Sequence, residues 1–388
     1  MSASVDKGAA FLGLSGEITD RQAIMKINAA GLLLCTFLVG CGGGDAPFGE
    51  GATDSETDSG TDGGTGTGGD TGEETGIIRE GLPPGTASPT PSSRIVRSEP
   101  TEAEGGKQGD GFATGIRYDG DTDVFTVDGL AFDGGNRYAR GENVSSLNDD
   151  YAVYEAFQQF PDGSNDELIN QFTHRAIYGV SRNLDSDGNP ATQFAIVRTG
   201  AYIPYGFGGF VYEREGSVAL PSNGQAVYRG KSAGVRDFEG AGGLEYATSN
   251  VEIAIDFEDF NDSTGVGGAG VRGIFSDRRV YDINGLDITD TVVSRINAQN
   301  DASIGTIPDA RFEVGPGVMD ANGEIIGEVF SNFVNDDGRV IEYETGKYYA
   351  IVSGDDANEL VGVIVAENSA ELDDITVRDT SGFIIYRD

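Results

Sequence analysis

From Phe112 to the C-terminus, short runs of residues with high β propensity recur at regular intervals. Val, Ile, Tyr, Phe and Thr dominate these runs, and Gly, Asn and Asp separate them. This pattern predicts an all-β antiparallel fold, either a sandwich or a closed barrel, and the glycines inside and beside the strands favour the barrel. The predicted strands are 124–127, 151–157, 172–180, 192–198, 209–213, 226–230, 251–257, 271–275, 311–314, 324–330, 340–343, 348–352, 360–365 and 382–386.

Three segments have the clearest local patterns. The turn-rich segment 185–190 between the runs 172–180 and 192–198 predicts a β-hairpin. The run 251–257 alternates apolar and polar residues, which is typical of a half-buried antiparallel strand, and 290–298 has the spacing of a helix. The apolar positions are Val251, Ile253, Ile255 and Phe257 in the strand, and Val292, Val293 and Ile296 in the helix.

A cluster of breakers divides the β region into two domains. The segment 220–224 combines Pro, Ser, Asn and Gly, which indicates a boundary. We therefore expect an antiparallel β handle domain at 112–219, followed by a barrel domain at 220–388.

The N-terminal part carries a short apolar run that ends at Cys41. Spanning a bilayer takes about 20 apolar residues, so this run fits the apolar region of a secretory signal better than a membrane span. Its last residues, Leu38, Val39, Gly40 and Cys41, resemble the lipobox of bacterial lipoproteins. The resemblance implies that the Cys41 thiol receives lipid and that Cys41 becomes the new N-terminus.

The residues before Met25 do not fit a signal, because they include acidic residues where a signal begins with basic ones. Met25 is followed by Lys26, which suits a signal. We expect residues 1–24 to be an over-extended start and 25–41 to be the lipoprotein signal peptide. A long genuine leader is the alternative.

Residues 42–111 have the composition of a disordered, acidic Gly/Thr/Pro linker. Apart from Phe48 and the pair Ile77 and Ile78, almost nothing in its Gly/Thr-rich part is apolar, so ordering entropy is not offset. The linker is therefore expected to hold a folded module away from a membrane. Cys35 lies in the signal and Cys41 would be acylated, so the mature chain has no thiol left for a disulfide.

The chain is strongly acidic, with 26 basic and 64 acidic residues and a formal net charge of −38. We expect no nucleic-acid partner, because phosphate binding needs a stripe of basic residues on the protein and none is visible in the sequence. Adsorption of the module to anionic lipid is disfavoured for the same reason. Solubility outside the cell accounts for the charge.

Two segments of the second domain are similar to a known family. The run 226–230 followed by the glycine turn 240–244 resembles the opening of the transferrin-binding-protein-B-like β-barrel. The segment 354–363, with Ala357, Glu359, Leu360 and Gly362 at the family spacing, resembles the signature ahead of a late strand of that barrel. Ile364 departs from the family, which usually has an aromatic residue there, and the chain has length for only one handle-plus-barrel unit.

This resemblance implies a surface-exposed outer-membrane lipoprotein with a handle domain and a filled, eight-stranded antiparallel barrel. It also implies a receptor or scavenger role, often for metal or haem carriers, and export through a dedicated outer-membrane translocon. It supplies no ligand-binding residues, because the partner-binding loops of the family vary.

His174 is the only histidine, and it lies in a predicted strand. A serine triad would have to use it, but no Gly-x-Ser-x-Gly elbow accompanies it, and the carboxylates show no catalytic spacing. We therefore expect no enzyme. A hydrogen-bonded structural histidine is the expectation, and a haem axial ligand is the alternative, so haem stays open as a cofactor.

Two acidic turns are candidate calcium-binding loops because they cluster carboxylates. They are Asp185-x-Asp187-Gly188-Asn189 and Asp320-x-Asn322-Gly323-Glu324. Neither has the glycine and glutamate positions of an EF-hand loop, and hairpins need such turns in any case. We expect turns and no metal site.

An aromatic, glycine-rich connection inside the handle is the candidate binding loop. It contains Tyr202, Tyr205, Phe207 and Phe210. Aromatic side chains on loops are common interface anchors, but they also cover the cores of small sheets, and both interpretations stay open.

Together these observations predict a lipid-anchored, non-enzymatic binding protein of a Gram-negative outer membrane. Gly42 follows Cys41, where an aspartate commonly marks retention in the inner membrane, so the sequence favours the outer membrane. The alternative is a periplasm-facing structural or interaction lipoprotein without a nutrient ligand.

Overall fold

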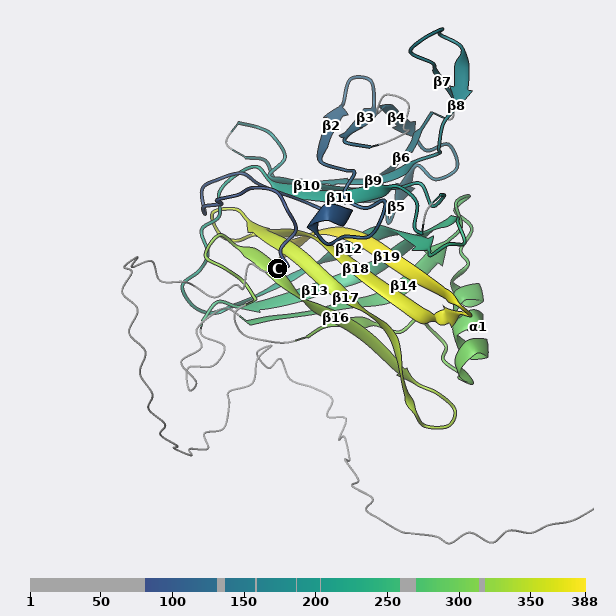
Figure 1. Cartoon of the computed structure of the whole chain (residues 1–388). Coiled ribbons are helices and arrows are strands. Elements are labelled where there is room, and N and C mark those ends of the chain that lie inside the picture. Colours follow the sequence, from purple (N-terminus) through teal and green to yellow (C-terminus); the bar gives the residue numbers. More distant parts are fainter. Residues whose placement is uncertain are drawn as a thin grey trace, which may run out of the picture. The chain divides into compact units, whose positions relative to one another are not determined.

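The computed structural model describes residues 81–388 except for 131–136, 158, 186, 203, 259–269 and 314–317. The predicted signal peptide, the lipobox with Cys41 and the linker up to residue 80 lie outside the described residues. The described part consists of a curled antiparallel sheet and a closed barrel, which pack against each other within one compact unit (Figure 1). The predicted all-β class is confirmed.

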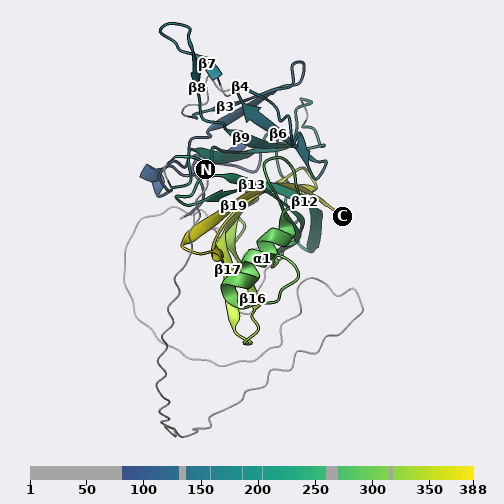
Figure 2. The same ribbon diagram turned by 90° about the vertical axis from the view of Figure 1, so that its right-hand side faces the viewer.

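The handle is a nine-stranded antiparallel sheet of order β1-β11-β10-β9-β6-β4-β3-β2, with β5 paired to β6. The hairpin predicted around 185–190 is confirmed by the pairing of β9 with β10. A separate hairpin, β7–β8, projects from the sheet (Figures 1 and 2). The strands are β1 (Ile95–Ser98), β2 (Gly115–Asp119), β3 (Val124–Asp128), β4 (Arg137–Arg140), β5 (Ser146–Leu147), β6 (Tyr151–Ala156), β7 (Gln159–Pro161), β8 (Leu168–Asn170), β9 (Arg175–Val180), β10 (Thr192–Arg198) and β11 (Gly208–Arg214).

The ordered structure begins earlier than the sequence indicated, because β1 and the 3-10 turn η1 (Glu102–Glu104) lie inside the predicted linker 42–111. β1 pairs along β11 and so forms one edge of the handle. Its Arg97 makes a buried, two-pronged ion pair with Glu324 of the barrel at 2.6 and 2.9 Å. A strand of four residues is too short for a periodic signal, and its partners are distant in sequence.

The barrel contains eight antiparallel strands in chain order and closes through the pairing of β12 with β19. Its strands are β12 (Gln225–Phe238), β13 (Leu244–Asp256), β14 (Gly270–Tyr281), β15 (Ala310–Phe312), β16 (Glu324–Val334), β17 (Val340–Ser353), β18 (Glu359–Leu372) and β19 (Ile375–Arg387). The predicted helix is α1 (Thr289–Asn300), which packs against β14 and β18, and its three predicted apolar residues are buried. It lies on the outside of the barrel (Figure 2).

Two predicted strands, 340–343 and 348–352, are one continuous strand, β17. The polar residues between them indicated a break. In the barrel, however, Glu344 is buried and paired with Arg278 of β14, so a charged residue is accommodated inside the strand.

The barrel interior is filled by side chains. Val251, Ile253 and Ile255 of β13 point inward as their alternation predicted, and Phe257 packs at the end of the same core. Phe312 stacks on Tyr348 with ring centroids 3.5 Å apart. These rings lie against glycine positions of neighbouring strands, where a side chain would collide with them.

A second apolar core joins the handle to the barrel wall. Phe194 and Phe210 of the handle pack there with Tyr349 and Ile384 of the barrel. This shared core uses β12, β13 and β17 to β19, so the handle covers that side of the barrel.

Candidate binding surface on the handle

The loop between β10 and β11 is held in place by its own hydrogen bonds and by the barrel. The Thr199 hydroxyl accepts the backbone amide of Phe207 at 2.9 Å. The loop carbonyls of Gly200 and Pro204 accept amides of the turn between β12 and β13, from Gly243 and Gly240, both at 2.6 Å. The glycine turn of the barrel therefore packs directly on the candidate loop.

Four aromatic rings gather at this loop, and we call them the aromatic patch: Phe112, Phe172, Tyr202 and Phe207. Tyr202 stacks on Phe207 with centroids 5.8 Å apart, and Phe207 meets Phe112 edge-on at 5.5 Å. Tyr202 is 65% exposed although its backbone has a φ of +68°. A large ring held exposed on a left-handed backbone is unusual for a residue with a merely structural role.

An open hollow of about 730 Å³ lies beside the aromatic patch. Phe112, Tyr202 and Phe207 form its apolar side, and Thr101, Glu102 and Gln108 add polar groups. Apolar rings with a few polar groups at the edge are typical of surfaces that bind ligands or proteins.

The other two predicted loop residues are buried. Phe210 is 1% exposed and belongs to the core between handle and barrel. Tyr205 is equally buried, and its ring contacts the cations of Arg378, at 4.1 Å, and Lys107, at 4.8 Å. These two rings cover the module's own core, so only Tyr202 and Phe207 of the four are available at the surface.

A buried charge cluster anchors the loop region from beneath. Arg198 of the handle pairs with Glu99 at 2.6 Å, and Arg378 of the barrel pairs with Asp237 at 2.7 Å. Arg378 also reaches Asp110 at 2.8 Å, which links the handle side to the barrel side. Burial lowers the pKa of the Arg378 guanidinium, but the attraction of Asp237 outweighs it and raises that pKa above its usual value. Because such pairs are costly to break, they fix the loop against the barrel.

His174 is completely buried in the handle, where its ring lies edge-on to Tyr138. Its Nδ1 is 3.3 Å from the Phe172 carbonyl oxygen, while Nε2 has no hydrogen-bond partner. Burial lowers the pKa of His174 to about 4, so the ring is neutral at physiological pH. His174 lines neither the hollow beside the aromatic patch nor the small hollow inside the barrel, which favours the structural role over a haem ligand.

The two acidic turns are hairpin and loop turns. The Asp185 carboxylate accepts the backbone amides of Asp187 and Asn189, and Asp320 accepts those of Asn322 and Glu324, all within 3.0 Å. Among the described residues, no group of three or more metal-ligating side chains is arranged to hold an ion.

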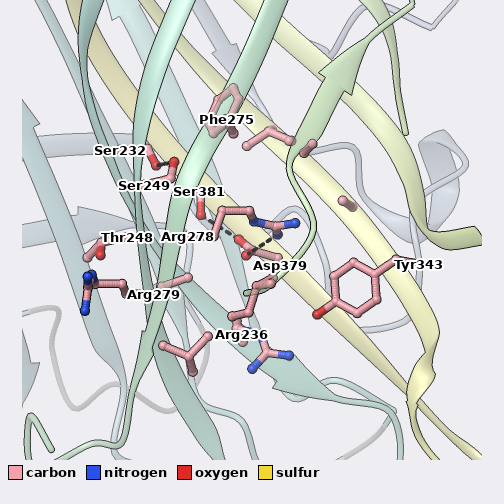
Figure 3. A pocket seen from close by; sticks show the side chains of 16 residues that line it. Ser232, Arg236, Thr248, Ser249, Phe275, Arg278, Arg279, Tyr343, Asp379 and Ser381 are labelled. Atoms are coloured by element: carbon pink, nitrogen blue, oxygen red, sulfur yellow. Dashed lines mark hydrogen bonds and ion pairs between the residues drawn. The ribbon is translucent and has the colours of Figure 1, made fainter. Parts of the chain in front are cut away.

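A small hollow of about 20 Å³ lies in the barrel interior near α1 and has room for about one water molecule (Figure 3). Arg278 and Asp379 point toward each other across it, 3.4 Å apart. Arg236 lies deeper and pairs with Glu245 and Glu371. This hollow is far too small for haem, and its charges are already paired.

Sequence reasoning missed Phe112 and Phe172 as members of the aromatic patch. Phe172 lay in a predicted strand and Phe112 at a predicted domain start, so neither had a local signal for exposure. The pairing of β9, β10 and β11 brings Phe172 to the loop, and the backbone amide of Phe112 donates to the Gly208 carbonyl at 3.0 Å, which places the third segment there.

Solved structures similar to the chain include three of transferrin-binding protein B. Two are variants of the Haemophilus parasuis Hp5 protein, with 12% identity and TM-scores of 0.32 and 0.34, and each match covers 76% of this chain and 45% of the other. A third is intact Ap-TbpB with its N and C lobes, with 12% identity and a TM-score of 0.33, covering 76% and 46%. The chain thus spans less than half the length of these proteins. No protein-family model and no curated protein matches the chain.

The expected single handle-plus-barrel lobe is confirmed by the strand pairing described above. Within the described part of the chain, no helix has the length and apolar character to cross a bilayer.

Proposed function

We propose that this protein is an outer-membrane-anchored, surface-exposed lipoprotein that binds a ligand or carrier protein and performs no catalysis. Lipid on Cys41 would anchor it, and the segment from Gly42 to residue 80 would extend it. The aromatic patch beside its open hollow is the observation that carries the binding role. The class of partner is a metal or haem carrier, and export would use an outer-membrane translocon.

The geometry of the aromatic patch supports protein binding in particular. Tyr and Phe supply large contact areas with little loss of side-chain entropy, and central aromatic residues dominate the binding energy of many interfaces. The loop is fixed by hydrogen bonds to the barrel turn, so little ordering entropy would be lost on binding. The similar solved proteins are described as transferrin-binding, which agrees with a carrier protein as partner.

Substitution of Tyr202, which is exposed, and Phe207, which is half-buried, tests the site. In the double variant Tyr202→Ser/Phe207→Ser we expect binding of a carrier to weaken by about 30-fold or more, since two interface anchors are lost. Iron-loaded transferrin, haemoglobin and free haem would be measured by interferometry. Tyr118→Ser is the matched control, because Tyr118 is another exposed aromatic residue of the handle, on β2. If the parent, the double variant and the Tyr118→Ser control bind the carrier with equal affinity, the aromatic patch is not the binding site.

The location is tested on intact cells. Protease is added outside, and an immunoblot follows the β module, with Cys41→Ala as the mis-sorted variant. Cleavage in intact cells agrees with a surface receptor. Protection until the outer membrane is opened would instead favour the periplasm-facing structural lipoprotein.

A further inference from the structure

The hollow beside the aromatic patch has a second wall, which is polar. This wall consists of Thr101, the 3-10 turn η1 and the loop 105–110 that follows. The backbone amide of Gly208 donates to the Gly109 carbonyl at 3.0 Å, and a Cβ added at Gly111 would come within 2.6 Å of the Thr101 nitrogen. The polar wall is therefore fixed to β11 and packed tightly on itself.

The charged groups that line the hollow are negative. Among the described residues of its lining, Glu102 and Asp110 carry carboxylates and none carries a positive charge. Asp110 is buried and already paired with Arg378, at 2.8 Å. Glu102 is exposed, and within the described part of the chain its carboxylate has no hydrogen bond or ion pair. The hollow thus presents one unpaired negative charge.

Two charged neighbours on the polar wall are engaged elsewhere. The Glu104 carboxylate accepts the Thr101 backbone amide at 2.9 Å and the Thr101 hydroxyl at 2.8 Å. The Lys107 amine pairs with Glu367 of β18 at 2.5 Å. Neither side chain lines the hollow, so the carboxylate of Glu102 keeps its charge there.

The aromatic wall presents rings in two orientations. The planes of Tyr202 and Phe207 are 17° apart, whereas the Phe112 ring stands at 88° to that of Phe207. All three rings line the hollow, and Tyr202 is largely exposed. Aromatic rings set at an angle to one another beside a carboxylate form an arrangement that suits a cation, because each ring face carries a negative partial charge.

We propose that this hollow receives an arginine side chain from the protein that binds the aromatic patch. The planar guanidinium stacks on Tyr202 while its N–H groups donate to the Glu102 carboxylate. Arginine is favoured over lysine because its guanidinium stacks and donates in one fixed geometry. This inference rests on the proposed function, because it names the partner group for the same surface.

Apolar and acidic partner groups fit the hollow less well. A partner that covered it with apolar side chains alone would bury the Glu102 carboxylate without a counter-charge, which is strongly unfavourable. An acidic group would face that carboxylate on a chain whose net charge is −38. A second copy of this chain is disfavoured for the same reason.

Peptide binding tests the proposal without any carrier. The probes are acetyl-Gly-Arg-Gly-amide and the same peptide with citrulline, which keeps the shape of arginine but has no charge. Ligand-observed NMR titrations of the full chain measure both dissociation constants. We expect the arginine peptide to bind about fivefold more tightly than the citrulline peptide, with a dissociation constant of about 10 mM.

Three variants assign this preference to the hollow. Glu102→Gln should weaken binding of the arginine peptide about threefold and leave the citrulline peptide unchanged, since only the attraction between charges is lost. Glu142→Gln, at another exposed glutamate of the handle, is the matched control and should bind both peptides as the parent does. Tyr202→Leu keeps an apolar side chain but removes the ring face, so it should also reduce the preference for arginine.

Equal affinity of the two peptides for the parent, or no binding of either at about 50 mM, would overturn the proposal. So would a loss in Glu142→Gln as large as that in Glu102→Gln, because general attraction to an acidic protein would then explain the preference.

Failure of this inference and failure of the proposed function are distinguishable. If the arginine preference is found but Tyr202→Ser/Phe207→Ser binds the carriers as the parent does, the cation site stands and the carrier site falls. If the carriers lose affinity in that double variant but the peptides show no preference for charge, the carrier site stands and the cation site falls.

Discussion

At the scale of single residues, two of the positions that carried the family resemblance have a structural role in the fold. The carbonyl of Ala357 accepts the Tyr228 hydroxyl at 2.6 Å, which holds the turn before β18 over the barrel interior. Glu359 is buried and accepts hydrogen bonds from Ser181 and Asn183 of the handle. These two residues serve the closure of the barrel and its attachment to the handle.

His174 should contribute a pH dependence to stability. Its pKa falls from 6.5 in the unfolded chain to about 4 in the fold, because burial disfavours the charged ring. Below pH 6.5 the unfolded chain binds a proton that the folded chain does not, so stability falls as the pH drops toward 4. Between pH 7 and pH 4 the free energy of unfolding of the parent falls, and we expect His174→Phe to make this fall about 3 kcal/mol smaller.

Urea unfolding of parent and variant at several pH values checks this prediction. The carboxylates contribute equally in both proteins, so the difference between the two curves isolates the histidine. Parallel curves would mean that His174 titrates normally in the fold.

At the scale of elements, glycines set how closely the handle approaches the barrel. The Phe194 ring of β10 lies against Gly179 of β9 and Gly382 of β19. A Cβ added at Gly382 would come within 2.2 Å of the ring, and one added at Gly179 within 2.3 Å. The ring thus occupies the space that two missing side chains leave.

Gly382→Ala should therefore destabilise the protein by about 1–3 kcal/mol, because the ring must move inside a packed core. Gly305→Ala is the matched control, since no atom lies within 4 Å of the added Cβ. Its stability should change by no more than about 0.5 kcal/mol. Chemical denaturation measures both, and a similar loss of stability in the two variants would contradict the packing explanation.

At the scale of the whole molecule, the handle and the barrel share one apolar core and several buried ion pairs. Separating them would expose apolar wall and leave buried charges such as Glu324 without a partner. We expect residues 81–388 to unfold in a single cooperative transition. Calorimetry checks this, and two separate heat-absorption peaks would show that the handle and the barrel are independent.

The sequence by itself determined the elements whose signal is local. The alternation in 251–257, the hairpin around 185–190 and the helical spacing of 290–298 all appear in the structure, because half-burial of one face imposes a period on the sequence. The lipobox at Cys41 is equally local, and the lipidation that it implies stays a prediction.

The tertiary structure decided everything that depends on partners distant in sequence. β1 exists because β11 offers it an edge, and β17 is continuous because Arg278 neutralises its buried Glu344. Tyr205 and Tyr202 are three residues apart in one aromatic loop, yet Tyr205 is buried in contact with two cations and Tyr202 is exposed. Composition cannot separate them, since burial is fixed by which strands and turns meet at the loop, and that is a property of the closed fold.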